Sequence, residues 1–259
     1  MKNPKTIVIT GASSGLGKAL ALYYAGPGIT LHLQGRNEAR LKETVHVCEV
    51  KGAAVRSQLI DVTDREAMEC WLVAADTESP IDLVIANAGI SAGIGGGGEN
   101  ADQSRALFAT NIDGVNNTIQ PLIPLMVKRK CGQIALVGSL AGMRGLSSSP
   151  AYSASKGWAR LYAEGLRGWL KDYGVEVNAV CPGFIRTPLT DVNPYKMPFI
   201  MSAEKAARII AEGLARNQAR IAFPRALYWP LWLLTCLPVS WTDPYFNTLP
   251  AKPSAPDIK

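Results

Sequence analysis

The stretch TGASSGLG, residues 10–17, follows a short β-branched run and leads into a helical pattern that begins near Lys18. Glycines permit a tight bend and let the backbone come close to a pyrophosphate. A helix that begins directly after the bend offers free N–H groups and a positive dipole end to that anion. The spacing is G-x-x-x-G-x-G rather than G-x-G-x-x-G, and a strand–helix turn without a ligand stays an alternative. The stretch predicts a first strand and a first helix joined by a dinucleotide-type turn.

Outward from this turn, short apolar runs alternate with longer amphipathic segments. The runs expected as strands are 6–10, 30–34, 53–59, 81–86, 133–137, 175–180 and 220–223. The segments expected as helices lie near 14–25, 37–51, 64–76, 102–129, 151–173 and 203–217. Because the runs are apolar throughout, they predict parallel strands covered on both faces. The expected fold class is α/β: a doubly wound, mostly seven-stranded parallel sheet of the Rossmann type, with right-handed crossovers.

No change in composition marks a linker, so one domain is expected over residues 1–224. It includes a lobe at 184–201 with three prolines, directly after a strand end. Insertions at strand carboxyl ends border the ligand crevice in such sheets, so this lobe is expected to cover a substrate. An ordinary irregular loop stays an alternative there, and the glycine cluster at 93–98 is expected as a surface loop. Residues 225–259 form a hydrophobic C-terminal extension and a polar tail.

The composition excludes several classes of protein. The chain has 259 residues, of which 47% are hydrophobic and 19% charged, as in globular proteins. Its 5 cysteines lie far apart and its histidines number 2, so neither a disulfide framework nor a metal site is expected. The net charge of +6 comes from dispersed residues, so no nucleic-acid partner is expected. The polar start and the absence of an apolar run of roughly 18 residues predict a cytoplasmic location.

Further motifs follow the glycine turn in order. They are Asp61-Val62, Asn87-Ala88-Gly89, Asn111, Ser139, Tyr152 with Lys156 four residues later, and Pro182-Gly183. Together with T-G-x-x-x-G-x-G, this series resembles the short-chain dehydrogenase/reductase family over about residues 5–223. The resemblance implies a single-domain Rossmann oxidoreductase that binds a nicotinamide nucleotide and acts on a CH–OH or carbonyl group.

The resemblance also implies where the cofactor binds. Asp61 and Val62 would border the adenine, and Thr187 would contact the nicotinamide carboxamide. Asn87 has two readings of equal weight, a cofactor contact or a tie between neighbouring strands. The full expected set is Gly11, Ser13, Ser14, Gly15, Leu16, Gly17, Arg36, Asp61, Val62, Asn87, Ala88, Gly89, Tyr152, Lys156, Pro182, Gly183 and Thr187.

Arg36 indicates which nicotinamide nucleotide fits. NAD-binding relatives carry an acid about 20 residues beyond the glycines, where it takes the ribose 2′-hydroxyl. Here the second expected strand ends in LHLQG and Arg36 follows, with no carboxylate at the tip. A 2′-phosphate would meet a fork-shaped cation instead of a repelling acid. A solvated helix-start residue is the alternative, and the prediction is NADP(H).

Tyr152 and Lys156 lie one turn apart on an expected helix and so share a face. Lowering the pKa of a tyrosine from about 10 to serve near neutrality requires roughly 4 kcal/mol. One cation about 4 Å away supplies roughly that much at an effective dielectric near 20. We therefore expect Tyr152 to be the general acid/base and Lys156 its tuning cation. Ser139 would steady the substrate oxygen. By resemblance, Lys156 also binds the nicotinamide ribose, and Asn111 kinks its helix and holds a water.

These residues predict NADPH-dependent, reversible reduction of a ketone or aldehyde to an alcohol. The largely apolar lobe favours a hydrophobic or lipid-like substrate. An NADP(H)-sensing binding protein with little turnover is the alternative. By resemblance, the helices near 102–129 and 151–173 would pair in a homodimer or homotetramer. The second of them carries an apolar surface that fits this, made by Trp158, Leu161, Tyr162, Leu166 and Trp169.

Residues 226–242 carry no charge and hold Trp229, Trp232 and Trp241, three of the 6 tryptophans. As one helix they would reach about 25 Å, short of the roughly 30 Å of a bilayer core. Pro230 and Pro238 are also expected to break that helix. Two readings stay open: packing on the protein itself, or peripheral contact with the inner face of a membrane.

Overall fold

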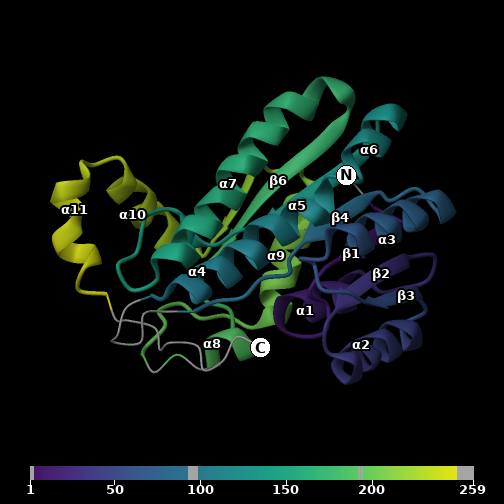
Figure 1. Ribbon diagram of the computed structural model, residues 1–259, viewed down its shortest axis with the longest axis horizontal. Helices are drawn as coiled ribbons and strands as arrows, with labels where there is room; N and C mark the ends of the chain where they lie inside the picture. The colour runs from purple at the N-terminus through teal and green to yellow at the C-terminus, as the bar shows by residue number, and fades with distance from the viewer. Residues whose placement is uncertain (1–2, 93–98, 192, 194, 250–259) are drawn as a thin grey trace.

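A seven-stranded parallel sheet runs through the protein in the order β3-β2-β1-β4-β5-β6-β7 (Figure 1). The computed structural model describes residues 3–92, 99–191, 193 and 195–249. The strands are β1 Thr6–Ile9, β2 Thr30–Gly35, β3 Ala54–Leu59, β4 Leu83–Ala86, β5 Gly132–Val137, β6 Val175–Pro182 and β7 Arg220–Phe223. The predicted fold class is confirmed. The strand order reverses between β1 and β4, and in such sheets the carboxyl ends of the strands open a ligand crevice at that point.

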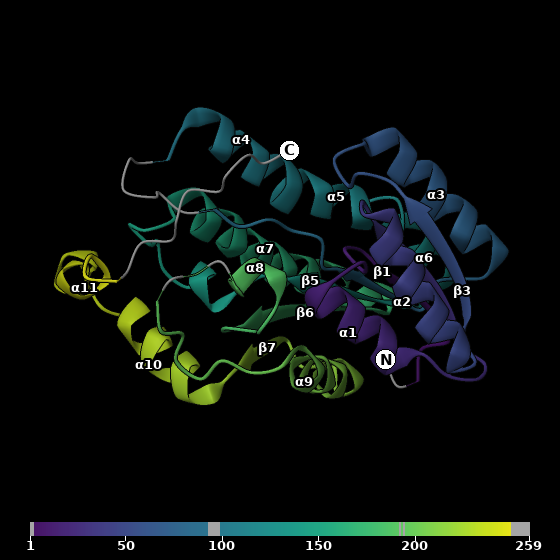
Figure 2. The same cartoon turned by 90° about the horizontal axis from the view of Figure 1, so that it is seen from below.

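Helices cover both faces of the sheet, as Figure 2 shows for α4 and α5 on one side and α9 on the other. The helices are α1 Gly15–Tyr24, α2 Glu38–Val50, α3 Arg65–Glu78, α4 Ala101–Phe108, α5 Gly114–Ile119, α6 Ile123–Arg129, α7 Pro150–Leu170, α8 Pro188–Asp191, α9 Ala203–Ala215, α10 Arg225–Thr235 and α11 Val239–Phe246. Side chains cap several of their first turns. Asn37 accepts from the Arg40 N–H before α2, and Asp64 accepts from the Ala67 N–H before α3.

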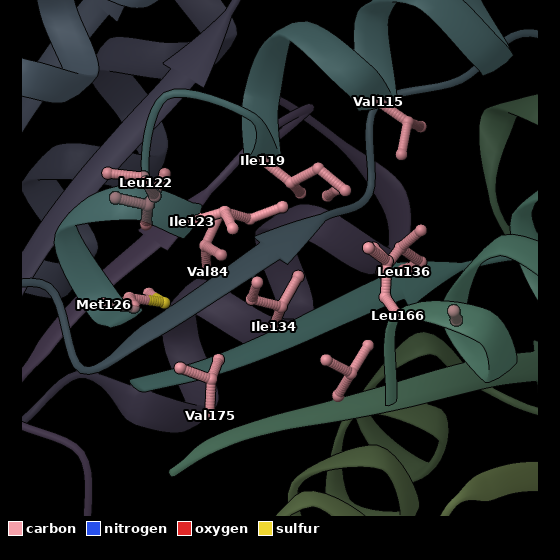
Figure 3. Packing of buried hydrophobic residues seen from close by; sticks show 14 of the residues in the cluster. Val84, Val115, Ile119, Leu122, Ile123, Met126, Ile134, Leu136, Leu166 and Val175 are labelled. Carbon is pink, nitrogen blue, oxygen red and sulfur yellow. The ribbon is translucent and has the colours of Figure 1, made fainter. Parts of the chain in front are cut away.

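Two apolar layers form the core, one on each face of the sheet. Successive residues of a strand point to opposite faces, so Ile7 and Ile9 pack with α1, α2 and α9, whereas Val8 packs with α3, α5 and α7. Figure 3 shows the second layer, where Ile134 and Leu136 of β5 lie among helix side chains. This two-sided burial explains why the central strands read as continuous apolar runs.

The single helix predicted over 102–129 is wrong. The structure has α4, a π-helical turn at Ala109–Asp113, then α5 and α6. The π turn holds Asn111, whose side chain bonds distant backbone instead of solvent. A further turn at 120–122 separates α5 from α6, which begins with Pro124 in its first turn. The π turn falls where the family resemblance implies a kink.

The break predicted at Pro230 is also wrong, because Pro230 lies inside α10. It stands only in the second turn of that helix. The carbonyl that loses its partner belongs to the exposed Ala226, so water can satisfy it. The chain does break at Pro238, which caps α11. Within the described residues, no helix combines the length and apolar character needed to cross a bilayer.

Candidate active site

A cleft of about 510 Å³ opens at the carboxyl ends of the strands around the point where their order reverses. Most of the residues predicted from the sequence line it. They are Gly11, Ser13, Ser14, Gly15, Leu16, Arg36, Asp61, Val62, Asn87, Ala88, Gly89, Ser139, Tyr152, Lys156, Pro182, Gly183 and Thr187. Of the predicted residues, Gly17 and Asn111 do not line the cleft and act from behind its wall.

The glycine turn forms one end of the cleft. Gly15 has a φ of +53°, in the left-handed region that favours glycine. A Cβ at Gly17 would overlap the carbonyl oxygen of Gly11, so α1 can pack this closely on the turn only without a side chain there. Ser14 caps α1 without a side-chain hydrogen bond, and the first turn carries no acid. This helix end therefore fits an anionic pyrophosphate.

Side chains from neighbouring strands hold the floor of the cleft together. The Thr10 hydroxyl accepts from the N–H groups of Asn87 and Ala88, each at 3.1 Å. The Asn87 amide donates to the Thr10 carbonyl at 2.9 Å. Asn87 therefore ties β4 to β1, as one of its two readings predicted, and it also lines the cleft, where a cofactor contact stays a prediction.

Gln34 contributes to this floor, and sequence reasoning missed it. Its side-chain oxygen accepts from the Gly11 N–H at 3.0 Å, and its amide donates to the Ile60 carbonyl. Gln34 therefore connects the glycine turn with the end of β3. The only signal in the sequence was a polar side chain at the carboxyl end of the expected strand, the end that borders the ligand crevice in such sheets.

At the rim of the cleft, Arg36 forms an ion pair with Asp61 at 3.1 Å. Burial opposes ionisation of Asp61, but hydrogen bonds from Thr63 and the Arg36 guanidinium outweigh it and lower the pKa of this carboxyl. Asp61 is thus a carboxylate at neutral pH and holds Arg36 beside the cleft. Arg40, in the first turn of α2, lines the same rim and was missed; its only signal in the sequence was a second cation shortly after Arg36.

The acid–base residues lie together in the cleft wall. Tyr152 and Lys156 are buried, with 8% and 5% of their surfaces exposed. The Lys156 ammonium donates to the Val137 carbonyl at 3.1 Å and lies 6.0 Å from the centre of the Tyr152 ring. Ser139 lies directly beyond β5, where its hydroxyl accepts from the Ala141 N–H at 3.1 Å.

The pKa of Tyr152 departs from the prediction. Burial raises the pKa of this phenol above its usual value, and a hydrogen bond with Ser139 only partly opposes the rise. The net direction is therefore opposite to the lowering of the Tyr152 pKa expected from Lys156. The physical reason is desolvation, which the spacing of two residues in a sequence does not reveal.

Asn111 lies behind Lys156 and is completely buried. Its amide donates to the Ile90 carbonyl and to the Ser155 hydroxyl, both at 3.0 Å, and its oxygen accepts from the Ile90 N–H at 2.9 Å. A Cβ at Gly89 would lie 3.0 Å from the Asn111 oxygen and 3.1 Å from the Lys156 nitrogen. Gly89 thus leaves room for these two side chains to approach each other.

Part of the lobe at 184–201 also lines the cleft. Ile185, Pro188 and Leu189 line it with apolar surface. Thr187 faces the glycine turn, because a Cβ at Gly15 would lie 3.1 Å from its methyl group. The lobe therefore borders both the dinucleotide-type turn and the acid–base residues.

The glycine cluster at 93–98 lies outside the described residues. Among the residues that the structure describes, no group of three or more metal-binding side chains is found.

Comparisons with known proteins agree with this geometry. A family model described as short chain dehydrogenase matches residues 5–196. An uncharacterised oxidoreductase of Myxococcus xanthus is 37% identical over 240 residues, which cover 90% of this chain and 93% of that protein. A 3-oxoacyl-(acyl-carrier-protein) reductase of Thermotoga maritima is 33% identical and covers 74% of this chain and 78% of its own. A solved short-chain dehydrogenase from Sphingobium yanoikuyae in complex with NADPH is similar with a TM-score of 0.79 and 25% identity, over 95% of this chain and 96% of that one.

Proposed function

Because this chain belongs to the short-chain dehydrogenase/reductase family and is thus an oxidoreductase, we propose that it catalyses the NADPH-dependent, reversible reduction of a ketone or aldehyde to an alcohol. One observation carries the proposal. Ser139, Tyr152 and Lys156 share one cleft with a glycine turn and a cationic rim. An acid–base group and a dinucleotide-type cradle in one cleft favour turnover over a purely sensing role.

The residues of the cleft fit NADP(H). The glycine turn and the free first turn of α1 suit the pyrophosphate, since a Cβ at Gly17 would fill the cradle. Arg36 and Arg40 supply two guanidinium groups at the rim, where a 2′-phosphate needs cations. When bound, NADPH supplies the hydride that reduces the carbonyl carbon.

Tyr152 supplies the proton. In the direction of reduction it must be protonated at the start, and burial raises the pKa of its phenol, which keeps the proton in place. Tyr152 donates this proton to the carbonyl oxygen of the substrate, and the Ser139 hydroxyl donates a hydrogen bond to the same oxygen. The buried Lys156 ammonium then stabilises the tyrosinate until solvent returns the proton.

Two finer features belong to this proposal. Apolar side chains of the lobe at the cleft favour a hydrophobic carbonyl substrate. A homodimer or homotetramer through α4 and α7 is favoured by Leu161 and Trp169 on α7, which are 60% and 58% exposed. Sedimentation of the full chain at micromolar concentration checks the second feature, and a monomeric mass would contradict it.

The test of the function is NADPH oxidation measured against a panel of ketones, aldehydes, quinones and 3-oxoacyl thioesters. We expect turnover of at least one class, and loss of that turnover in Tyr152→Phe. The variant should bind NADPH within about twofold of the parent, because it loses one hydroxyl and no charge. Parent-like activity in Tyr152→Phe would refute the assigned role. NADPH binding without turnover of any member would favour the sensing protein.

A further inference from the structure

The C-terminal part of the chain presents two different surfaces. Helices α10 and α11, here called the tail helices, lie together at one end of the molecule in both views (Figures 1 and 2). The inner side of α10 packs Leu227, Tyr228 and Leu231 against the apolar layer that contains α7. The first alternative given for residues 226–242, packing on the protein itself, therefore holds for the inner side of α10 only.

The outer surface of the tail helices is apolar and exposed. Trp229, Trp232 and Leu233 recur at helical spacing on one side of α10, with 56%, 39% and 60% of their surfaces exposed. Leu237, Val239 and Trp241 follow in the connection and in α11. No charged residue occurs from 226 to 242. Exposed aromatic and aliphatic side chains in such number mark a contact surface.

Arg144 fastens this surface to the catalytic part of the protein. Its guanidinium pairs with Asp243 at 2.7 Å and lies 5.3 Å from the centre of the Phe246 ring. Phe246 is 2% exposed, so α11 is held by a buried anchor. Arg144 lies in the segment between Ser139 and Tyr152. These two residues are the ones that the proposed function places at the substrate oxygen. The outer surface therefore has a fixed orientation relative to the cleft.

We propose that the outer surface of the tail helices docks the protein on the interfacial layer of an anionic phospholipid bilayer. Tryptophan favours that layer because its ring is apolar and its N–H is polar. Neither tail helix can cross a bilayer, so docking is peripheral.

Charge favours a bilayer over a second copy of the chain. The protein carries a net charge of +6, and the exposed Arg225 begins α10 at the base of the surface. In a symmetric contact a second copy would bring another Arg225 to this surface, whereas an anionic bilayer brings the opposite charge.

Docking would bring the substrate end of the cleft towards the lipid. A Cβ at Gly183 would lie 3.0 Å from Pro224 and 3.4 Å from Leu227, so α10 begins beside the cleft wall. An apolar carbonyl compound dissolved in the bilayer could then enter the cleft without crossing bulk water. This consequence rests on the proposed function, whereas the docking itself does not.

Vesicle flotation tests the docking. The full chain is mixed with phosphatidylcholine vesicles that contain phosphatidylglycerol and compared with two variants. Trp229→Ser/Trp241→Ser changes two side chains of the outer surface, and Trp169→Ser changes a similarly exposed tryptophan on α7. We expect the parent and Trp169→Ser to float, and the double variant to lose at least about tenfold in its partition coefficient.

Two results would overturn the proposal: a parent that does not float, and equal loss of binding in the double variant and in Trp169→Ser. If the parent does not float but forms a dimer that the double variant dissociates, the occupant of the surface is a second copy of the chain. NADPH oxidation with a water-soluble ketone is measured for the same variants. If the double variant no longer floats but keeps its activity, the outer surface acts in docking and not in catalysis. Absence of activity in the parent and in every variant would count against the proposed function alone.

Discussion

Replacing Arg36 by methionine tests the assignment of NADPH most directly. The substitution keeps an unbranched apolar stem and removes the guanidinium group with its charge. A hydrogen bond between ionised groups contributes about 1.5–3 kcal/mol when well formed. Arg36 is 53% exposed and already paired with Asp61, so solvent and the existing ion pair reduce its contribution to the low end, about 1.5 kcal/mol. We expect Arg36→Met to weaken NADPH binding by about tenfold.

The assay is calorimetric titration of both nucleotides. NADH has a hydroxyl where NADPH has the phosphate, so its dissociation constant should change less than about twofold. The loss for NADPH should be larger at low salt, because the lost contact is between charges. Arg56→Met is the matched control, since Arg56 is another exposed arginine paired with an acid, Glu78, away from the cleft. Equal weakening of NADPH and NADH binding would show that Arg36 acts on the fold of the rim. Unchanged binding of both nucleotides would refute its role.

Three other expectations follow from packing and burial. Gly17→Ala should lower the free energy of unfolding by about 1–3 kcal/mol in denaturant titration and weaken NADPH binding, because the new methyl group overlaps the preceding turn; unchanged stability would contradict this packing. Asn111→Ala should cost about 2–3 kcal/mol in the same titration, since both backbone groups of Ile90 lose their partner, and a parent-like midpoint would contradict it. Burial raises the pKa of the Cys48 and Cys181 thiols to about 11, so iodoacetamide at neutral pH should alkylate the three exposed cysteines first, as mass spectrometry would show; early labelling of Cys48 would refute its burial.

The strands were predictable because their signal is local. The β-branched run before the glycine turn and the apolar run before Asn87 each end within one residue of the observed strand. The family resemblance supplied most of the cleft, since its motifs follow strand ends that the topology brings to one edge. Sequence order and spacing were sufficient to predict these cleft residues, because parallel strands bring their carboxyl ends together at one edge of the sheet.

The remainder depends on contacts between distant residues. The π turn at Asn111 depends on Ile90 and Ser155, which lie 21 and 44 residues away. The direction of the Tyr152 pKa depends on how much protein covers the phenol, and the spacing to Lys156 says nothing about that. Gln34 connects the glycine turn with the end of β3, which lie far apart in the sequence, so no local pattern predicts this contact.

The hydrogen bonds between Thr10 and Asn87 have a consequence for protein engineering. They tie the ends of β1 and β4 without any help from the lobe or the tail helices. The apolar cleft residues Ile185, Pro188 and Leu189 come from a later part of the chain, after β6. Under the proposed function, we therefore expect libraries confined to residues 184–246 to alter which carbonyl compound is accepted, while the glycine turn and the ends of β1 and β4 stay unchanged.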